Sequence, residues 1–242
     1  MLTALLLATA SSCGGQPTSF MPENDLHLED VYFKSAAGEE MFDRIIDIAA
    51  EEYRGLADDN NERLIINKRW NDSTVNADVS RRWGTVYINM YGGLYRRPEV
   101  TPEAFALVVC HELGHAYGGS PYIYRSTEMS AEGQADYYGA RECLRRVISH
   151  FEETPEAAEM DLPYAEDVCE EEGCVRGLKA GYGLGWLLQA LTGEDSVSYE
   201  TPDETEVSET ELSYPATTQC RLDTYRAGIL YEERPRCWFK PE

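Results

Sequence analysis

Residues 110–115, Cys-His-Glu-Leu-Gly-His, place two of the chain's four histidines four positions apart, with a glutamate directly after the first. On a helix this spacing puts His111 and His115 on one face, about one turn apart, so both imidazoles can bind the same metal ion. Glu112 lies roughly 100° around the helix from His111. From there its carboxylate can reach a water on the ion without being a ligand. The motif therefore predicts a metal site carried by a helix.

The sequence around this motif predicts the helix that it needs. Thr101, Pro102 and Glu103 form a typical helix start, with a hydroxyl N-cap, a proline at the first helical position and an acid in the first turn. Gly118-Gly119 ends the segment. The apolar positions between are Phe105, Leu107, Val108, Val109 and Leu113. We expect a mostly buried helix of about four turns; the less favoured interpretation is two core histidines that share this spacing by chance.

A second helix is expected to supply the third ligand, because catalytic zinc usually has three protein ligands and a water. Residues 128–151 are predicted to form this helix, with Ser130 as its N-cap. Glu132 and Asp136 are four apart and share a face. We predict Glu132 as the third ligand and Asp136 as the acid that holds a ligand imidazole in the right tautomer. Glu128 is the rival ligand, and a solvated helix-start glutamate is the alternative for Glu132.

The two motifs, His-Glu-Leu-Gly-His and Glu132-Gly-Gln-Ala-Asp136, resemble the H-E-x-x-H and E-x-x-A-D pattern of the gluzincins. They are most similar to the HtpX and CAAX-prenyl-protease family of metallopeptidases and its soluble periplasmic relatives. Asn76-Ala77-Asp78 and the stretch 84–94 are similar to the strands before the motif in that family. The chain also resembles uncharacterised bacterial lipoproteins with His-Glu-Leu-Gly-His, Glu-Gly-Gln-Ala-Asp-Tyr and Arg-Pro-Arg-Cys-Trp-Phe, here Arg234–Phe239. The gap from the first motif to the second is shorter than in much of the peptidase family.

This resemblance implies an α+β, zincin-like fold with a small mixed sheet, a helix carrying H-E-x-x-H and a second helix carrying the glutamate ligand. It implies one Zn²⁺ per chain on His111, His115 and Glu132, with Glu112 as general base in peptide hydrolysis. In zincins the strand before the motif helix commonly lies at the sheet edge and pairs with an extended substrate. The resemblance therefore implies that residues 84–91 form the edge strand that pairs with substrate; the alternative is an ordinary sheet strand.

The expected function is that of a zinc-dependent metalloendopeptidase acting on envelope or extracellular proteins, with a protein or peptide as substrate. The alternative is an envelope lipoprotein that binds or assembles partners and whose zinc is structural. Glu112 favours the enzyme, because a structural site needs no base. The oxyanion donor remains open among Tyr122, Tyr124, Arg141, His150 and Tyr182.

The first residues predict export. Residues 2–12 are an apolar run that ends in small residues before Cys13 and is too short to span a bilayer. Because Ala-Ser-Ser-Cys-Gly resembles a bacterial lipobox, we expect 1–12 to be an export signal, Cys13 to carry a lipid and 13–30 to be a tether. Residues 31–242 then form the catalytic domain. The chain is expected in the bacterial envelope, attached to a membrane only by this lipid, as an outer-membrane lipoprotein facing the periplasm or the cell surface; a plain cleaved signal is the alternative.

Six cysteines follow Cys13, an even number that predicts up to three disulfides in an exported chain, with 15 possible pairings. They are Cys110, Cys143, Cys169, Cys174, Cys220 and Cys237. Cys169 and Cys174 are the easiest local pair. Cys110 and Cys143 belong to the two predicted site helices and can pair with each other or with other partners.

Charge excludes one class of partner. The chain has 44 acidic and 21 basic residues, a net charge of −23, and no basic stripe that could meet phosphates. We therefore expect no nucleic acid partner and no direct contact with an anionic membrane surface. Residues 193–213 are rich in Asp and Glu and are predicted to be a solvated or disordered loop.

Overall fold

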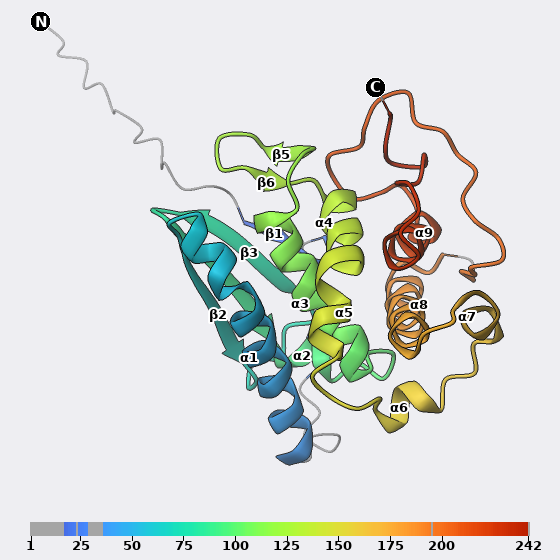
Figure 1. Ribbon diagram of the computed structural model, residues 1–242, viewed down its shortest axis with the longest axis horizontal. Coiled ribbons are helices and arrows are strands. Elements are labelled where there is room, and N and C mark those ends of the chain that lie inside the picture. The colour runs from blue at the N-terminus through green and yellow to red at the C-terminus, as the bar shows by residue number, and fades with distance from the viewer. Residues whose placement is uncertain (1–16, 23, 29–35, 195, 242) are drawn as a thin grey trace, which may run out of the picture.

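The structure, a computed structural model, describes residues 17–22, 24–28, 36–194 and 196–241. The predicted export signal and the predicted lipid site, Cys13, lie outside them. In these residues helices are combined with a small sheet of mixed strand direction, the α+β class expected from the sequence (Figure 1). No helix of this described part is long and apolar enough to cross a membrane.

The sheet has four strands in the order β1-β3-β4-β2. Its strands are β1 (Thr18–Ser19), β2 (Arg63–Arg69), β3 (Ala77–Arg82) and β4 (Thr85–Tyr91). β2 runs parallel to β4, and the other neighbours are antiparallel. Val86, Ile88 and Met90 of β4 are buried while the residues between them are partly exposed, so the alternating apolar residues set one face of this strand against the core.

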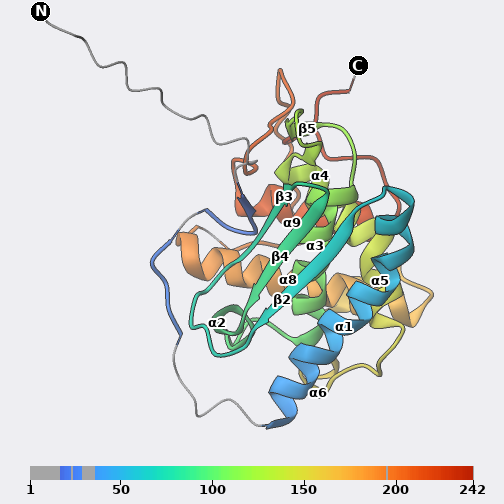
Figure 2. The same ribbon diagram turned by 90° about the vertical axis from the view of Figure 1, so that its left-hand side faces the viewer.

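β4 does not lie at the edge of the sheet. It pairs with β3 on one side and with β2 on the other along nearly its whole length, so the expected edge position of residues 84–91 is wrong. Figure 2 shows β3, β4 and β2 side by side in front of α3 (Pro102–Tyr117). The edges of the sheet are β2 and the two-residue β1, which lies against β3.

The helices form two further layers. α1 (Ala36–Asp59) lies beside the sheet, and α3 lies between the sheet and a pair of later helices, α8 (Glu172–Thr192) and α9 (Thr218–Ile229) (Figure 1). Short elements join them: α2 (Gly92–Tyr95), β5 (Tyr122–Tyr124), β6 (Met129–Ser130), α6 (Pro155–Ala158) and α7 (Pro163–Val168). α3 is therefore the central element of the fold, and fifteen of its sixteen residues are buried.

α3 begins and ends where the sequence predicts. The Thr101 hydroxyl accepts a hydrogen bond from the Ala104 backbone N–H at 3.1 Å, and Pro102 is the first helical residue. Gly118 is the C-cap.

The second site helix starts later than expected. α4 (Glu132–Tyr138) continues through a π-helical turn, η2 (Gly139–Cys143), into α5 (Leu144–Ile148). Ala131, not Ser130, is the N-cap, because Ser130 belongs to β6 and its hydroxyl donates to the Gly119 carbonyl at 2.7 Å. The loop before Glu132 is thereby tied to the end of α3.

The segment expected to be a tether is partly built into the domain. Residues 18–19 form β1, and Phe20 and Met21 are 0 % and 3 % exposed. The mostly polar composition of 13–30 gave no sign of this, because Phe20 and Met21 are its only buried large apolar residues among those described. The tether prediction is therefore wrong for residues 18–21.

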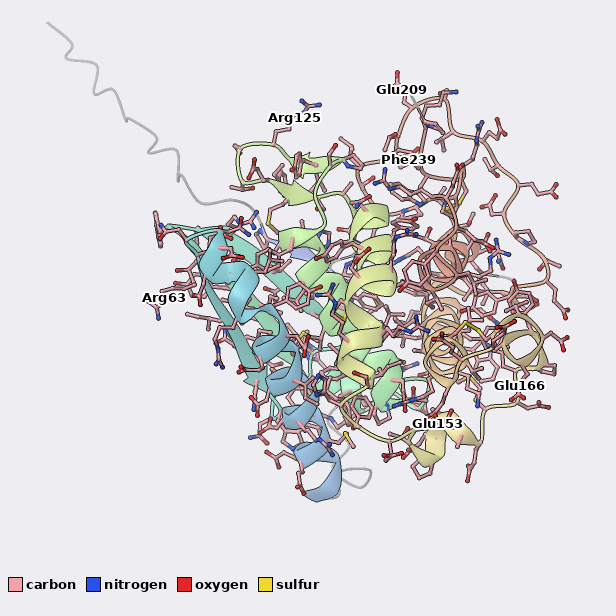
Figure 3. All side chains as sticks on the ribbon, viewed as in Figure 1. Arg63, Arg125, Glu153, Glu166, Glu209 and Phe239 are labelled. Carbon is pink, nitrogen blue, oxygen red and sulfur yellow. A yellow bond between two sulfur atoms is a disulfide. The ribbon has the colours of Figure 1, made fainter. Side chains whose placement is uncertain are left out.

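The acidic loop, residues 193–213, packs more closely against the rest of the fold than expected. Residues 193–213 contain no helix or strand among their described residues. Val197 and Tyr199 are nevertheless buried, and the Val207 N–H donates to the Arg236 carbonyl at 3.0 Å. Acidic side chains such as Glu166 and Glu209 lie at the periphery (Figure 3).

Three disulfides connect the six described cysteines. They are Cys110–Cys143, Cys169–Cys174 and Cys220–Cys237. The first joins α3 to η2 and encloses both site motifs, and the local pair is the one expected. Three disulfides in one chain are typical of proteins that fold in an oxidising, extracytoplasmic compartment.

Candidate metal centre

His111, His115 and Glu132 converge where α4 begins beside the last turns of α3. The Glu132 Oε2 atom lies 3.5 Å from His111 Nε2 and 3.4 Å from His115 Nε2, and one ligand atom from each residue falls within 4.8 Å of the others. All three side chains are buried, with at most 3 % of each exposed. These residues could hold a metal ion.

The other nitrogen of each imidazole is engaged in a way that fixes the ring. His111 Nδ1 lies 2.7 Å from Asp136 Oδ1, and His115 Nδ1 lies 2.8 Å from the Ser130 carbonyl oxygen. Because a carbonyl and a carboxylate accept hydrogen bonds, both Nδ1 atoms carry the proton in the neutral rings. Each Nε2 then presents its lone pair to the centre of the cluster, as metal ligation requires.

The polar atoms at the centre of the cluster are left without partners. Among the described residues, His111 Nε2, His115 Nε2, Glu132 Oε2 and both carboxyl oxygens of Glu112 are buried and form no hydrogen bond. Five buried polar atoms without partners in one place would cost several kcal/mol if nothing bound them. A cation with its water would satisfy all of them, so the donor set fits a metal ion.

A buried arginine that the sequence did not reveal completes the support of His111. Arg221 of α9 donates from Nε to Asp136 Oδ2 and from Nη2 to Asp136 Oδ1, both at 2.8 Å. This forked pair is the geometry in which guanidinium and carboxylate bind most strongly. Arg221 lies 85 residues from Asp136 in the chain, so no local pattern could have indicated it.

The carboxylates of the cluster stabilise positive charge there, whether it is a proton on His111 or a metal ion. Burial acts to lower the pKa of the His111 imidazole, but the Asp136 carboxylate outweighs it and raises this pKa to about 9. Burial acts to raise the pKa of Glu132, but the charges of the nearby His115 and His111 imidazoles lower it to about 2. Asp136 behaves similarly: Arg221 and His111 overcome burial and hold its carboxyl pKa well below the usual range. Both acids are therefore carboxylates at neutral pH.

Glu112 differs from the other two acids. Burial raises the pKa of its carboxyl well above the usual range, and His111 opposes this only in part. No cation is paired with Glu112 among the described residues. A metal ion beside it would lower this pKa and favour the carboxylate that accepts a proton.

Glycines let the two site helices approach each other. A Cβ atom on Gly114 would lie 2.5 Å from the Ala135 carbonyl oxygen, and one on Gly139 would lie 2.9 Å from the Cys110 carbonyl oxygen. Both contacts are with backbone atoms, which cannot move aside as a flexible side chain can. The glycine inside the His-Glu-Leu-Gly-His motif therefore brings Glu132 within reach of the histidines.

The predicted oxyanion donors have partners elsewhere. His150 Nε2 lies 2.8 Å from Glu52, Arg141 donates to the Tyr137 hydroxyl at 3.0 Å, and the Tyr182 ring packs at a tilt against Trp186. Tyr122 and Tyr124 lie in the β5–β6 hairpin. Tyr214, directly after the acidic loop, is instead near the cluster: burial and then the Glu132 charge raise the pKa of its hydroxyl.

A second group with metal-ligand atoms, Asp203, Cys220 and Cys237, is not a comparable site. Cys220 and Cys237 are joined in a disulfide, and a disulfide sulfur is not the thiolate that binds metal. The rival ligand Glu128 is exposed.

Comparison with known proteins adds nothing to this geometry: no family model matches the chain, and neither a curated protein nor a solved structure does.

Proposed function

We propose that the chain is a zinc-dependent metalloendopeptidase with a zincin-like arrangement of its two site helices. The observation that carries the proposal is the convergence of His111, His115 and Glu132 with the unpaired carboxyl of Glu112 beside them. The resemblance of both motifs to the gluzincin pattern supports it.

The spacing of the ligand atoms supports zinc. Zinc binds imidazole nitrogen and carboxylate oxygen at about 2.0–2.2 Å in tetrahedral sites, so two such ligands lie about 3.4 Å from each other. The distances from Glu132 Oε2 to the two Nε2 atoms, 3.5 and 3.4 Å, agree with this value. Two imidazoles and one carboxylate match the three protein ligands of catalytic zinc sites, whereas structural zinc sites usually have four.

When bound, zinc supplies a Lewis acid that activates water and polarises a substrate carbonyl. The chain's own residues supply the rest. Glu112 takes a proton from the attacking water and passes it to the leaving amine. Asp136 and the Ser130 carbonyl keep the two imidazoles in the ligating tautomer. Arg221 keeps Asp136 ionised.

One observation favours the alternative, a binding or assembly factor with structural zinc: the cluster is fully buried. A structural site would have no use for Glu112, whose burial without a partner is costly. We therefore place the enzyme first. The predicted lipid on Cys13 would make the protein an envelope lipoprotein, with proteins of that compartment as its substrates.

The test compares three zinc-loaded proteins on a pool of reduced, unfolded proteins: the wild type, Glu112→Gln and His115→Ala. Glu112→Gln should retain zinc and lose at least about 100-fold in cleavage rate, because it removes only the proton acceptor. His115→Ala should lose both zinc and cleavage, as measured by metal content after dialysis. Full activity of Glu112→Gln would contradict the mechanism. Zinc binding without cleavage by the wild type would favour the binding factor.

A further inference from the structure

The metal cluster is closed in this structure, and the chain's own N-terminal residues form part of its cover. We call residues 17–22 the N-terminal strap. The Phe20 ring stands edge-on to the His111 imidazole, with 5.3 Å between the ring centroids. The Glu132 N–H donates to the Leu212 carbonyl at 3.4 Å, so the segment that leads to Tyr214 also contacts the start of α4.

The strap is held on β3 as an added strand. Thr18 and Ser19 lie opposite Val79 and Asp78 in antiparallel register. The Phe20 N–H donates to the Ala77 carbonyl at 3.0 Å. An extended peptide that joins the edge of a sheet makes the same backbone bonds.

Asn76, directly before β3, holds the next residue of the strap. Its Oδ1 accepts from the Met21 N–H at 3.1 Å, and its Nδ2 donates to the Met21 carbonyl at 3.2 Å. One side-chain amide thus satisfies both backbone groups of Met21. Asn76 hydrogen-bonds to the backbone of Met21, not to its side chain. It could therefore bind a peptide of another sequence in the same way.

Two side chains from the C-terminal half hold the strap's carbonyl groups. The Tyr214 hydroxyl donates to the Ser19 carbonyl at 2.8 Å, and Arg221 Nη1 donates to the Phe20 carbonyl at 2.8 Å. Arg221 is the residue that also holds Asp136, and through it His111. The backbone of the strap is therefore bound by β3 and by three side chains, the last of which, Arg221, belongs to the metal cluster's support.

Two side chains of the strap, Thr18 and Phe20, lie on its buried face. Thr18 and Phe20 share the face of β1 that carries Val79 on its neighbour, and both are buried. The Phe20 ring lies between His111 and the Arg221 guanidinium, whose Cζ is 4.7 Å from the ring centroid. The Thr18 hydroxyl is buried and has no hydrogen-bond partner in the described part of the chain. An unpaired hydroxyl is more costly in a permanent core than in a segment that leaves.

We propose that the N-terminal strap is a built-in occupant of a peptide-binding edge: an extended peptide reaches the metal cluster by displacing residues 17–22 and pairing with β3 in their place. This inference rests on the proposed peptidase function for its ligand. The incoming peptide takes over Asn76, Tyr214 and Arg221, and it places a bulky apolar side chain where Phe20 lies. A free protein with the strap seated is latent.

A reversible lock tests this. Ser19 and Asp78 face each other, and Cα atoms opposite one another in antiparallel strands lie within disulfide reach. In the double variant Ser19→Cys, Asp78→Cys, oxidation fixes the strap on β3. Zinc removal by an excess of chelator should become at least about tenfold slower than in the single variant Asp78→Cys, and peptide cleavage should fall by a similar factor. Mild reductant should restore both, while the same reductant leaves the wild type unchanged.

A second pair of variants tests whether loosening the N-terminal strap exposes the metal cluster. Phe20→Ala removes the side chain that covers His111, whereas Phe42→Ala removes an equally buried ring on α1 as a control for lost core packing. Zinc loss to the chelator should become about tenfold faster in Phe20→Ala only.

The readouts separate the two proposals. The proposal that the strap controls access to the metal would be wrong in either of two cases. In the first, zinc is removed by the chelator at the same rate in the locked protein and in Asp78→Cys. In the second, Phe20→Ala and Phe42→Ala accelerate zinc loss equally. If the rate of zinc removal changes with the strap as expected but neither the wild type nor any variant cleaves peptide, the strap proposal stands and the peptidase proposal is refuted.

Discussion

At the scale of single residues, Asp136 connects the candidate metal ligand His111 to Arg221. Asp136→Asn should weaken zinc binding by about 10–100-fold, because the amide orients His111 less firmly and leaves Arg221 without its counter-charge. The control is Asp223→Asn, a buried aspartate of α9 that bonds Gln219 and the Asp203 N–H instead. A competition titration with a fluorescent chelator measures both. Equal losses in the two variants would mean that Asp136 matters only for folding.

The third ligand can be tested with two glutamates four residues apart. Glu132→Ala should weaken zinc binding by more than the roughly 10–100-fold cost of losing a ligand's supporting partner. Glu128→Ala should leave zinc binding unchanged, because Glu128 is exposed. Metal content after dialysis against a fixed concentration of free zinc distinguishes them. Loss of zinc from Glu128→Ala and not from Glu132→Ala would mean that Glu128, not Glu132, is the third ligand.

Local spacing predicted those residues that share a helix turn and missed those that come from far along the chain. His111 with His115, and Glu132 with Asp136, follow the four-residue period of a helix. Arg221, Phe20 and Tyr214 reach the cluster only through tertiary packing, 85 or more residues from the groups that they contact. The only available signal for Arg221 was chemical: a buried carboxylate on a ligand histidine needs a counter-charge, and 21 basic residues were candidates.

At the scale of helices, the crossing of α3 and α4 depends on Gly114. Gly114→Ala should lower the free energy of unfolding by about 1–3 kcal/mol, because the new methyl group meets the Ala135 backbone. It should also weaken zinc binding by moving Glu132 away from the histidines. Gly55→Ala, at an exposed position of α1 with nothing within 4 Å of the new Cβ, should stabilise the protein by about 0.5–1 kcal/mol. Urea unfolding of both variants measures the difference, and equal effects would refute the close crossing.

Strand order and disulfide pairing are the parts of the fold that a single sequence could not predict. α3 has the expected bounds because capping is a local signal, and β4 falls within the strand that the resemblance implies for 84–91. Which strand lies at an edge is decided by pairing between distant segments, so β4 was misplaced and the two-residue β1 was missed. The cysteine count likewise predicted up to three disulfides, but the pairs Cys110–Cys143 and Cys220–Cys237 depended on the fold.

At the scale of the whole molecule, the dominant physical property is charge. The 44 acidic residues exceed the 21 basic ones by 23, so the folded chain repels itself at neutral pH. Acidic side chains such as Glu166 and Glu209 lie at the periphery, where salt screens them (Figure 3). Salt should therefore stabilise the fold, whereas the buried pair of Asp136 and Arg221 should be nearly insensitive to it.

We expect the melting temperature to rise as NaCl increases from 0.01 to 0.15 M, because the screening length falls from about 30 to about 8 Å. A gain of 1 kcal/mol corresponds to a rise of about 2–4 °C for a chain of this length. The triple variant Glu166→Gln, Glu204→Gln, Glu209→Gln removes three exposed acids that form no ion pair within the described residues. It should melt higher at 0.01 M and gain less from salt, because less repulsion remains to be screened. Arg125→Gln, which makes the net charge more negative, should shift both quantities in the opposite direction. A melting temperature that falls with salt would mean that attractive surface pairs outweigh the net repulsion.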